Sequence, residues 1–198
     1  MLAKRQWEDW EVCSLLRVFV FFLCLCSAVP GWAFTRYALV IGNDDYEEVV
    51  DLQKARNDAT AVSEALDAEG YEVTTLLDAK RRQMNQAIST FTGKLEPGDV
   101  AMVFFAGHGV EIDGENYLLP TDVLAPNSGD EDLVKTESIA LSRLLDQIRQ
   151  TGARTTLAII DACRENPFAA ATGRSIGGTR GLGRISAPEG TFVIFSAA

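Results

Sequence analysis

The chain has a single histidine, His108, and a single cysteine, Cys163, after its first 33 residues. Each residue ends a hydrophobic run, DVAMVFFAGH over 99–108 and TTLAIIDAC over 155–163. A thiol and an imidazole are the nucleophile and the base of cysteine catalysis. A lone cysteine is also commonly a small buried apolar residue, so the residue types alone leave a catalytic and a packing interpretation open.

Two glycines and an aspartate accompany this pair. Gly107 and Gly109 flank His108, and without side chains they let the backbone come close to a substrate. The backbone amides of Gly109 and Cys163 could together bind a developing oxyanion. Asp161 lies two positions before Cys163, so both side chains share one face of an extended strand. The Asp161 carboxylate is either a pocket group that pairs with a basic side chain or a solvated strand-end aspartate.

Strand and helix patterns alternate from Arg36 onward. The predicted strands are the apolar runs at 37–41, 71–77, 99–106, 155–161 and 191–195. The predicted helices cover 57–69, 80–95 and 141–150, with Asn57 or Asp58 capping the first and Ser138 the third. A short hairpin is expected within 114–120. Because the fifth strand ends so close to the last residue, we expect further elements beyond it and a truncated domain.

This alternation predicts an α/β fold with a mostly parallel sheet and helices on both faces. In such a sheet, ligands bind outside the carboxyl ends of the strands. His108 and Cys163 are both expected at that edge, which favours the catalytic interpretation of the pair.

The first 33 residues differ from the rest of the chain. A 12-residue apolar stretch at 18–29 follows Lys4, Arg5 and Arg17 and precedes the small residues Gly31 and Ala33. This pattern is typical of a secretory signal peptide and too short for an ordinary membrane span. An uncleaved membrane anchor is the alternative. We therefore expect an exported protein, periplasmic or secreted, whose domain covers 34–198.

Composition limits the class of partner. Hydrophobic residues at 47% and charged residues at 23% are typical of a globular protein. The net charge of −10, with no basic stripe to offset it, argues against a nucleic-acid partner and is compatible with basic protein or peptide substrates. In an exported domain, a single thiol has no partner for an internal disulfide and needs another explanation.

Two segments resemble the histidine and cysteine motifs of bacterial caspase-like peptidases, the metacaspase and orthocaspase group. They are FFAGHGV at 104–110 and IDACRENPF at 160–168, and segments 37–43, 57–59 and 116–120 also match in order. The separation of the two candidate residues, 55 positions (163 − 108), is close to the roughly 50 typical of caspases. The resemblance covers about 36–198 and implies a caspase-like three-layer sandwich.

The resemblance also implies an activity, cleavage of peptide bonds after Arg or Lys. Cys163 would attack the scissile carbonyl, and His108 would act as base and then protonate the leaving amine. The amides of Gly109 and Cys163 would form the oxyanion hole. The acidic groups that hold the basic substrate side chain match Asp161 and Asp58, although Asp58 has the alternative role of helix cap. An aspartate-specific pocket would need arginines, whereas the residue beside this nucleophile is acidic.

Several alternatives stay open. The Gly- and Arg-rich loop at 164–190 offers Arg174, Arg180 and Arg184 as autoprocessing sites, or is a flexible linker. Some relatives require calcium, but no spacing here matches a calcium loop, so no metal ligand is assigned and calcium dependence is open. A non-catalytic caspase-like binding module is the second interpretation, and the presence of both His108 and Cys163 argues against it. A nucleotide-binding domain lacks its Gly-x-Gly-x-x-Gly run after the first strand.

Overall fold

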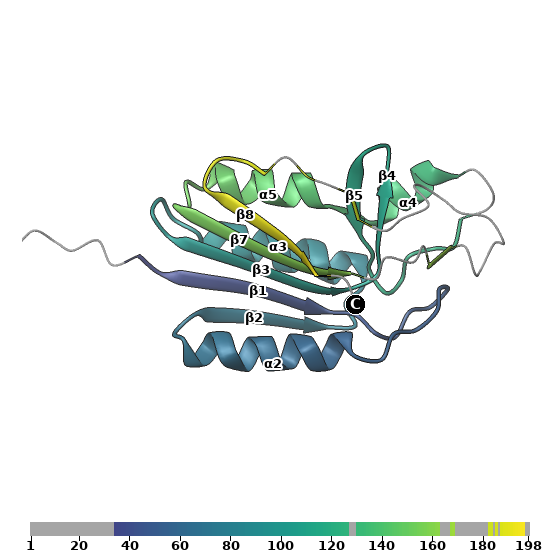
Figure 1. Ribbon diagram of the computed structural model, residues 1–198, viewed down its shortest axis with the longest axis horizontal. Coiled ribbons are helices and arrows are strands. Elements are labelled where there is room, and N and C mark those ends of the chain that lie inside the picture. The colour runs from purple at the N-terminus through teal and green to yellow at the C-terminus, as the bar shows by residue number, and fades with distance from the viewer. Residues whose placement is uncertain are drawn as a thin grey trace, which may run out of the picture. The chain divides into compact units, whose positions relative to one another are not determined.

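The fold is described from a computed structural model of the chain (Figure 1). The structure describes residues 34–126, 130–162, 167–168, 182–183, 185 and 187–196. The expected signal peptide, Cys163, and the three loop arginines Arg174, Arg180 and Arg184 lie outside the described residues. Within the described ranges, no helix is long and apolar enough to cross a membrane.

Parallel strands form the central sheet. They are β1 (Arg36–Gly42), β2 (Glu72–Leu77), β3 (Val100–Gly107), β7 (Thr155–Ala162) and β8 (Thr191–Ser196), in the order β2-β1-β3-β7-β8. The central strands β1 and β3 are buried on both faces, as their continuous apolar runs predict. Parallel pairing brings the carboxyl ends of all these strands to one edge of the sheet (Figure 1).

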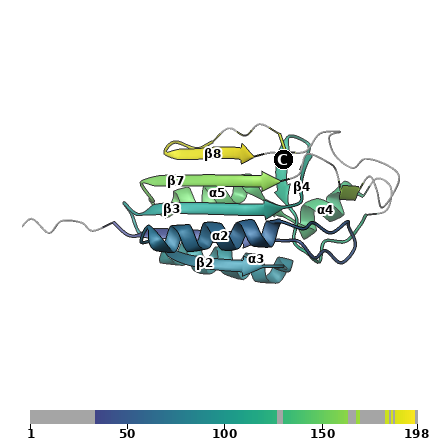
Figure 2. The same cartoon turned by 60° about the horizontal axis from the view of Figure 1, so that its bottom comes forward.

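Helices cover both faces of the sheet, which confirms the predicted α/β architecture (Figure 2). Helix α2 (Ala55–Ala68) packs on one face, against Ala38, Val40 and Phe104. Helices α3 (Arg81–Lys94) and α5 (Leu141–Gln150) pack on the other. The core on that side contains large buried side chains of strands and helices, including Leu39, Ile41, Met84, Phe91, Phe105, Leu144 and Ile160. Burying each of these stabilises the fold by about 1.5–3 kcal/mol.

A small antiparallel sheet follows β3 immediately. It consists of β4 (Gly109–Ile112), β5 (Glu115–Leu118) and β6 (Ile139–Ala140), and helix α4 (Glu131–Glu137) precedes β6. Asp113 and Gly114 both have positive φ, 53° and 81°, as a two-residue hairpin turn requires. The hairpin therefore begins before the segment at 114–120 in which it was expected. Along the chain, His108 is the single residue between β3 of the central sheet and β4 of the small sheet.

Two predicted helix caps are wrong, for one physical reason. Helix α2 begins at Ala55, and its first free amides, Ala55 N and Arg56 N, donate to the Asp44 carboxylate at 2.9 and 3.1 Å. Asp58 lies inside the first turn, where its N–H donates to the Lys54 carbonyl at 2.9 Å, so neither it nor Asn57 is the cap. A distant carboxylate at the positive end of the helix performs that role instead.

Helix α5 repeats this arrangement. Its N-cap residue is Ala140, and the amide of Ser142 donates to the Glu115 carboxylate at 3.1 Å. Ser138, which was predicted to cap α5, is instead the C-cap residue of α4, and it is buried. Among the described residues, no group hydrogen-bonds the Ser138 hydroxyl.

Candidate active site

His108 is fixed through its backbone and its ring. It joins β3 to β4 and is 3% exposed. Its N–H donates to the Tyr46 hydroxyl at 2.8 Å, and its carbonyl accepts from Leu119 N at 3.0 Å. The Tyr46 ring lies against the imidazole, with the ring centroids 4.7 Å apart. The imidazole therefore has one defined position at the carboxyl edge of the sheet.

The hydrogen bonds of the imidazole determine which nitrogen can act as a base. Nε2 lies 2.7 Å from the Val50 carbonyl oxygen, which can only accept, so Nε2 carries the proton and Nδ1 the lone pair. Nδ1 is buried and has no hydrogen-bond partner among the described residues. Burial lowers the pKa of His108 below 6.5, against the opposing effects of the Val50 carbonyl and the Asp51 charge. At neutral pH the site thus presents an uncharged imidazole with a basic Nδ1.

The flanking glycines make room for groups of the protein itself. A Cβ atom on Gly107 would lie 2.8 Å from the Tyr46 hydroxyl, the group that holds the His108 backbone. A Cβ atom on Gly109 would lie 2.8 Å from Leu182 Cδ2 and 3.2 Å from Ala162 Cβ. Sequence analysis predicted close approach of a substrate at these glycines, and the structure adds close packing within the protein.

The strand register relates β7 to the histidine. In the β3–β7 pair, Ala106 is opposite Asp161 and Gly107 is opposite Ala162. His108 and Cys163 are the next residues on the two strands. Because Cys163 lies outside the described residues, its contact with His108 stays a prediction.

An acidic cavity of about 340 Å³ lies next to Gly107, the residue before His108. It is lined by residues 51–55 and Asp58 from the loop after β1 and the start of α2, and by Ala106, Gly107 and Asp161 from the strand ends. The fold thus brings Asp58 and Asp161 to one cavity, although they are distant in sequence. Asp51 is a third carboxylate, which sequence analysis missed. With Lys54 as the opposing charge, the described lining carries a net charge of −2.

The loop that lines this cavity is held by hydrogen bonds of polar side chains. Asn43 is fully buried, accepts from Ala79 N at 2.9 Å and donates to the Leu119 carbonyl at 3.1 Å. Asp78 accepts from the amide of Asp44 at 2.9 Å, and Asp51 accepts from Tyr46 N at 2.9 Å. Asn43 belongs to one of the motifs noted in the sequence, whereas nothing in the spacing of Tyr46 or Val50 indicates contact with the histidine.

No metal centre is found in the described part of the chain, where no three His, Cys, Asp or Glu side chains converge on one point. The three carboxylates of the acidic cavity therefore do not form a ready calcium site.

Comparison with known proteins identifies a family for the domain. The family model described as a caspase domain matches residues 35–198. The human mucosa-associated lymphoid tissue lymphoma translocation protein 1 is 28% identical over 130 residues, which make up 66% of this chain and 15% of that protein. The mouse homolog matches to the same extent. The chain thus spans about 15% of the length of these curated relatives.

A solved structure shares the fold. The crystal structure of a protein from Geobacter sulfurreducens has a TM-score of 0.52 at 19% sequence identity, over 65% of this chain and 50% of that one.

Proposed function

Because the chain belongs to the caspase domain family, we propose that it is a cysteine endopeptidase that cleaves peptide bonds after Arg or Lys. The observation that carries this proposal is the acidic cavity next to Gly107, the residue before His108 with its buried, neutral imidazole. In this proposal, His108 is the base and the acidic cavity binds the positive side chain of the substrate. Both lie at the carboxyl edge of the sheet, where the family resemblance implies the thiol.

Covalent geometry supports a His108–Cys163 dyad. Cys163 directly follows Ala162 in the sequence, and Ala162 is opposite Gly107, the residue before His108, on the neighbouring strand. Because neighbouring strands lie about 4.8 Å apart, a cysteine that continued β7 by one residue would be close enough to His108 for its thiol to reach Nδ1. Nδ1 would take the thiol proton as sulfur attacks the scissile carbonyl. The resulting imidazolium would then give that proton to the departing amine, and water would release the acyl group.

The oxyanion of the tetrahedral intermediate needs donors near the nucleophile. The backbone amides of Gly109 and Cys163 are our candidates, because Gly109 packs beside Ala162, the residue before the nucleophile. A side chain at position 109 would displace Leu182 or Ala162 and so disturb this arrangement.

The specificity for basic residues follows from charge. An arginine or lysine side chain in the acidic cavity would meet Asp161 from the strand end, with Asp58 and Asp51 nearer the solvent. An aspartate side chain would meet three like charges there. Asp161 is the less exposed of the two predicted carboxylates, so it should contribute more to binding than Asp58.

A panel of arginyl, lysyl and aspartyl amide reporters, with and without calcium, tests this function. We expect turnover of the two basic reporters, its loss in Cys163→Ala, and covalent labelling of Cys163 by a thiol-reactive arginine-based inhibitor. Wild-type turnover retained in Cys163→Ala would contradict the proposal. A folded protein that neither turns over a reporter nor takes up the label would instead support a non-catalytic caspase-like binding module.

Two further parts of the proposal concern the regions outside the described residues. We propose export through the leader at 1–33, and autoprocessing after Arg174, Arg180 or Arg184. Mass spectrometry of purified wild type and Cys163→Ala tests the second: fragments ending at these arginines should form only with the thiol present. The mass of the mature amino terminus after expression in a secreting host distinguishes a cleaved signal peptide from a retained anchor.

A further inference from the structure

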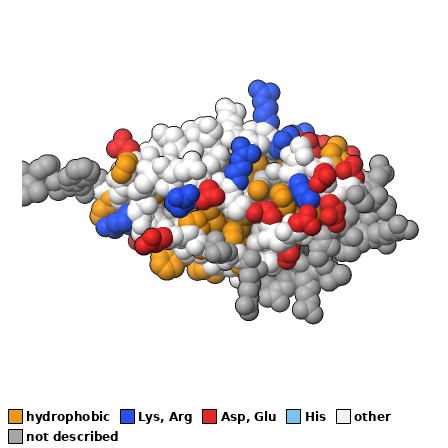
Figure 3. Space-filling model, turned by 90° about the horizontal axis from the view of Figure 1, so that it is seen from above, with side chains coloured by type: hydrophobic (Ala, Val, Ile, Leu, Met, Phe, Trp, Pro, Cys, Tyr) orange, Lys and Arg blue, Asp and Glu red, His pale blue; other side chains and the backbone are white. Residues whose placement is uncertain are grey.

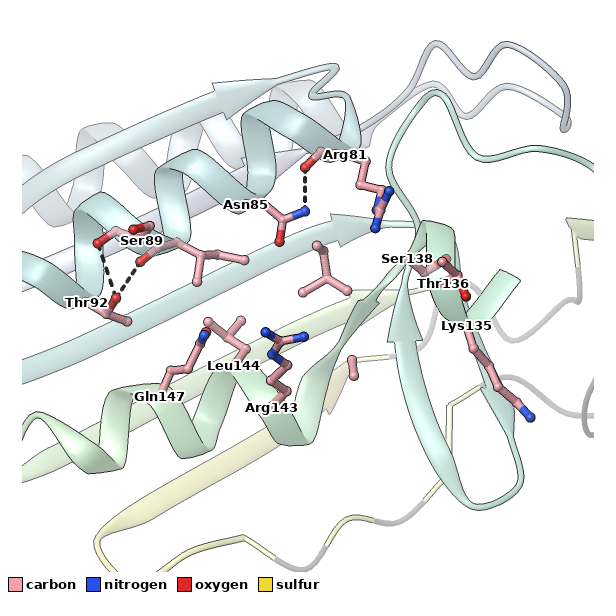
Figure 4. Close-up of a pocket in the computed structure, with 13 residues that line it drawn as sticks. Arg81, Asn85, Ser89, Thr92, Lys135, Thr136, Ser138, Arg143, Leu144 and Gln147 are labelled. Atoms are coloured by element: carbon pink, nitrogen blue, oxygen red, sulfur yellow. Dashed lines mark hydrogen bonds between the residues drawn. The ribbon is translucent and has the colours of Figure 1, made fainter. Parts of the chain in front are cut away.

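A second cavity, of about 370 Å³, lies between α3 and α5 on the face of the sheet opposite α2 (Figure 4). Both helices turn polar side chains toward it at intervals of three or four residues. Arg81, Asn85, Ser89 and Thr92 come from α3, and Arg143 and Gln147 come from α5. The rest of the lining is mainly apolar and includes Ile88, Ile139, Ala140 and Leu144. We call this space the basic pocket.

The charge of the basic pocket is positive. Arg81, Lys135 and Arg143 all line it. Lys135 is engaged by Asp113 at 2.8 Å and Asp132 at 3.1 Å, and Arg81 contacts Glu137 at 3.4 Å. Arg143 has no ion pair among the described residues, and Figure 4 shows its guanidinium turned toward the space between the helices. Figure 3 shows both signs of charge intermingled on the surface it views.

Two buried polar groups of the basic pocket lack partners. Ser138 is 8% exposed, and neither its Oγ nor the buried Nε of Arg81 has a hydrogen-bond partner among the described residues. Buried donors without acceptors are rare because leaving them unpaired is unfavourable. An anion in the pocket would supply acceptor oxygens to the guanidinium groups of Arg81 and Arg143, and to the Ser138 hydroxyl if that side chain turned toward the ligand. Helices α3 and α5 both begin at this end of the pocket, where the first amides of each helix already donate to a carboxylate, Asp122 for α3 and Glu115 for α5.

We infer that the basic pocket binds a small anion through a phosphate or carboxylate group, with Arg143, Arg81 and Ser138 as its main contacts. The amides of Asn85 and Gln147 provide hydrogen bonds for the rest of the ligand. This site is separate from the acidic cavity, and the inference does not depend on peptidase activity.

Calorimetric titration of the full chain with sodium phosphate, and separately with sodium succinate, tests the inference, with chloride holding the ionic strength constant. The two titrations distinguish a phosphate ligand from a carboxylate ligand. We expect wild type to bind at least one of them and Arg143→Gln to bind it at least about tenfold more weakly, because a charge-assisted hydrogen bond is lost. The matched control is Arg149→Gln, an exposed arginine of α5 outside the pocket, which should bind like wild type.

Ser138→Ala separates a binding role from a merely structural one. Removing a buried hydroxyl without a partner should leave the urea midpoint unchanged or higher. If the hydroxyl contacts the anion, affinity should nevertheless fall several-fold. The inference is overturned if wild type binds neither anion, if Arg143→Gln binds as tightly as wild type, or if Arg149→Gln weakens binding equally. Equal affinity in Ser138→Ala would overturn the assigned contact of that hydroxyl.

Discussion

The acidic cavity and the basic pocket lie on opposite faces of one sheet and are built in different ways. Strand ends and a loop line the acidic cavity, and two helix sides line most of the basic pocket. At the acidic site, Asp44, Asp51 and Asp78 accept hydrogen bonds that fix the loop itself. At the basic pocket, a hydroxyl and a guanidinium nitrogen are buried without partners in the described structure. Each region also uses some polar groups to hold its shape, since Arg81 pairs with Glu137 beside the basic pocket. On the acidic side, the buried group without a partner in the described structure is Nδ1 of His108.

The two regions show that the net charge of the whole chain does not predict the charge of a single site. The chain carries −10 overall, yet it contains a pocket with three cationic side chains. If the two regions are independent, a substitution in one should leave the measured property of the other unchanged. The following changes test that independence.

The largest effect is expected for His108→Gln. Loss of the base should lower kcat for an arginyl reporter by about a thousandfold or more. Phosphate or succinate binding in the basic pocket should not change. Steady-state kinetics and calorimetry on the same preparation measure both properties. Reporter turnover within tenfold of wild type would rule out His108 as the base.

Asp161→Asn should act on specificity. Removing this carboxylate should lower kcat/KM for arginyl and lysyl reporters by about ten- to a hundredfold, since the substrate cation loses a close partner. Asp58→Asn should show a smaller loss in the same assay because Asp58 is exposed. Equal losses of kcat/KM in the two variants would contradict the larger role given to Asp161. If Asp161→Asn kept the wild-type preference for basic reporters, Asp161 would have no role in binding the substrate side chain.

Asp44→Ala should lower stability on the acidic side of the molecule. Two amides of α2 lose their acceptor, and helix caps of this kind contribute about 0.5–2 kcal/mol. Urea unfolding of this variant and of its exposed neighbour Asp45→Ala measures the difference. Similar midpoints for the two variants would show that the Asp44 cap adds nothing to stability.

A smaller effect is expected from pH. The pKa of His108 is lowered in the folded protein, so below 6.5 the unfolded chain binds a proton that the folded chain excludes. Stability should therefore fall as pH decreases from 6.5 to the lowered folded pKa. Below that pKa, this contribution should become constant. Urea unfolding of wild type and His108→Gln across pH 5 to 8 isolates the contribution, and parallel curves for the two proteins would contradict it.

The parts of the molecule that could be predicted from sequence depend on local pattern. Uninterrupted apolar runs define β1 and β3 to within about a residue, because strands buried on both faces need such runs. The bounds of β7 were predicted as closely, although its residues alternate between buried and partly buried. The order of the runs then places His108 at the carboxyl edge of the sheet. Asp161 and Asp58 were associated through the family resemblance, and the fold brings both to one cavity.

The remaining features depend on contacts between distant segments. The first turns of α2 and α5 are capped by the carboxylates of Asp44 and Glu115. Because these residues belong to other segments of the chain, no local sequence pattern indicates the caps. The Val50 contact with His108 is made by a backbone carbonyl, which has no side-chain signature. The basic pocket joins Arg81 to Arg143, two arginines on different helices that look like ordinary solvated charges in the sequence.

The short loop after β1 has a consequence for how substrates are distinguished. Its Val50 carbonyl orients the imidazole, and the residues that follow it line the acidic cavity. A peptide with arginine before the scissile bond would place its guanidinium in the cavity, restrict the motion of this loop and so hold the His108 imidazole in position. A peptide with alanine at that position would leave the loop unrestricted. Discrimination between substrates should then appear in the turnover number as well as in KM.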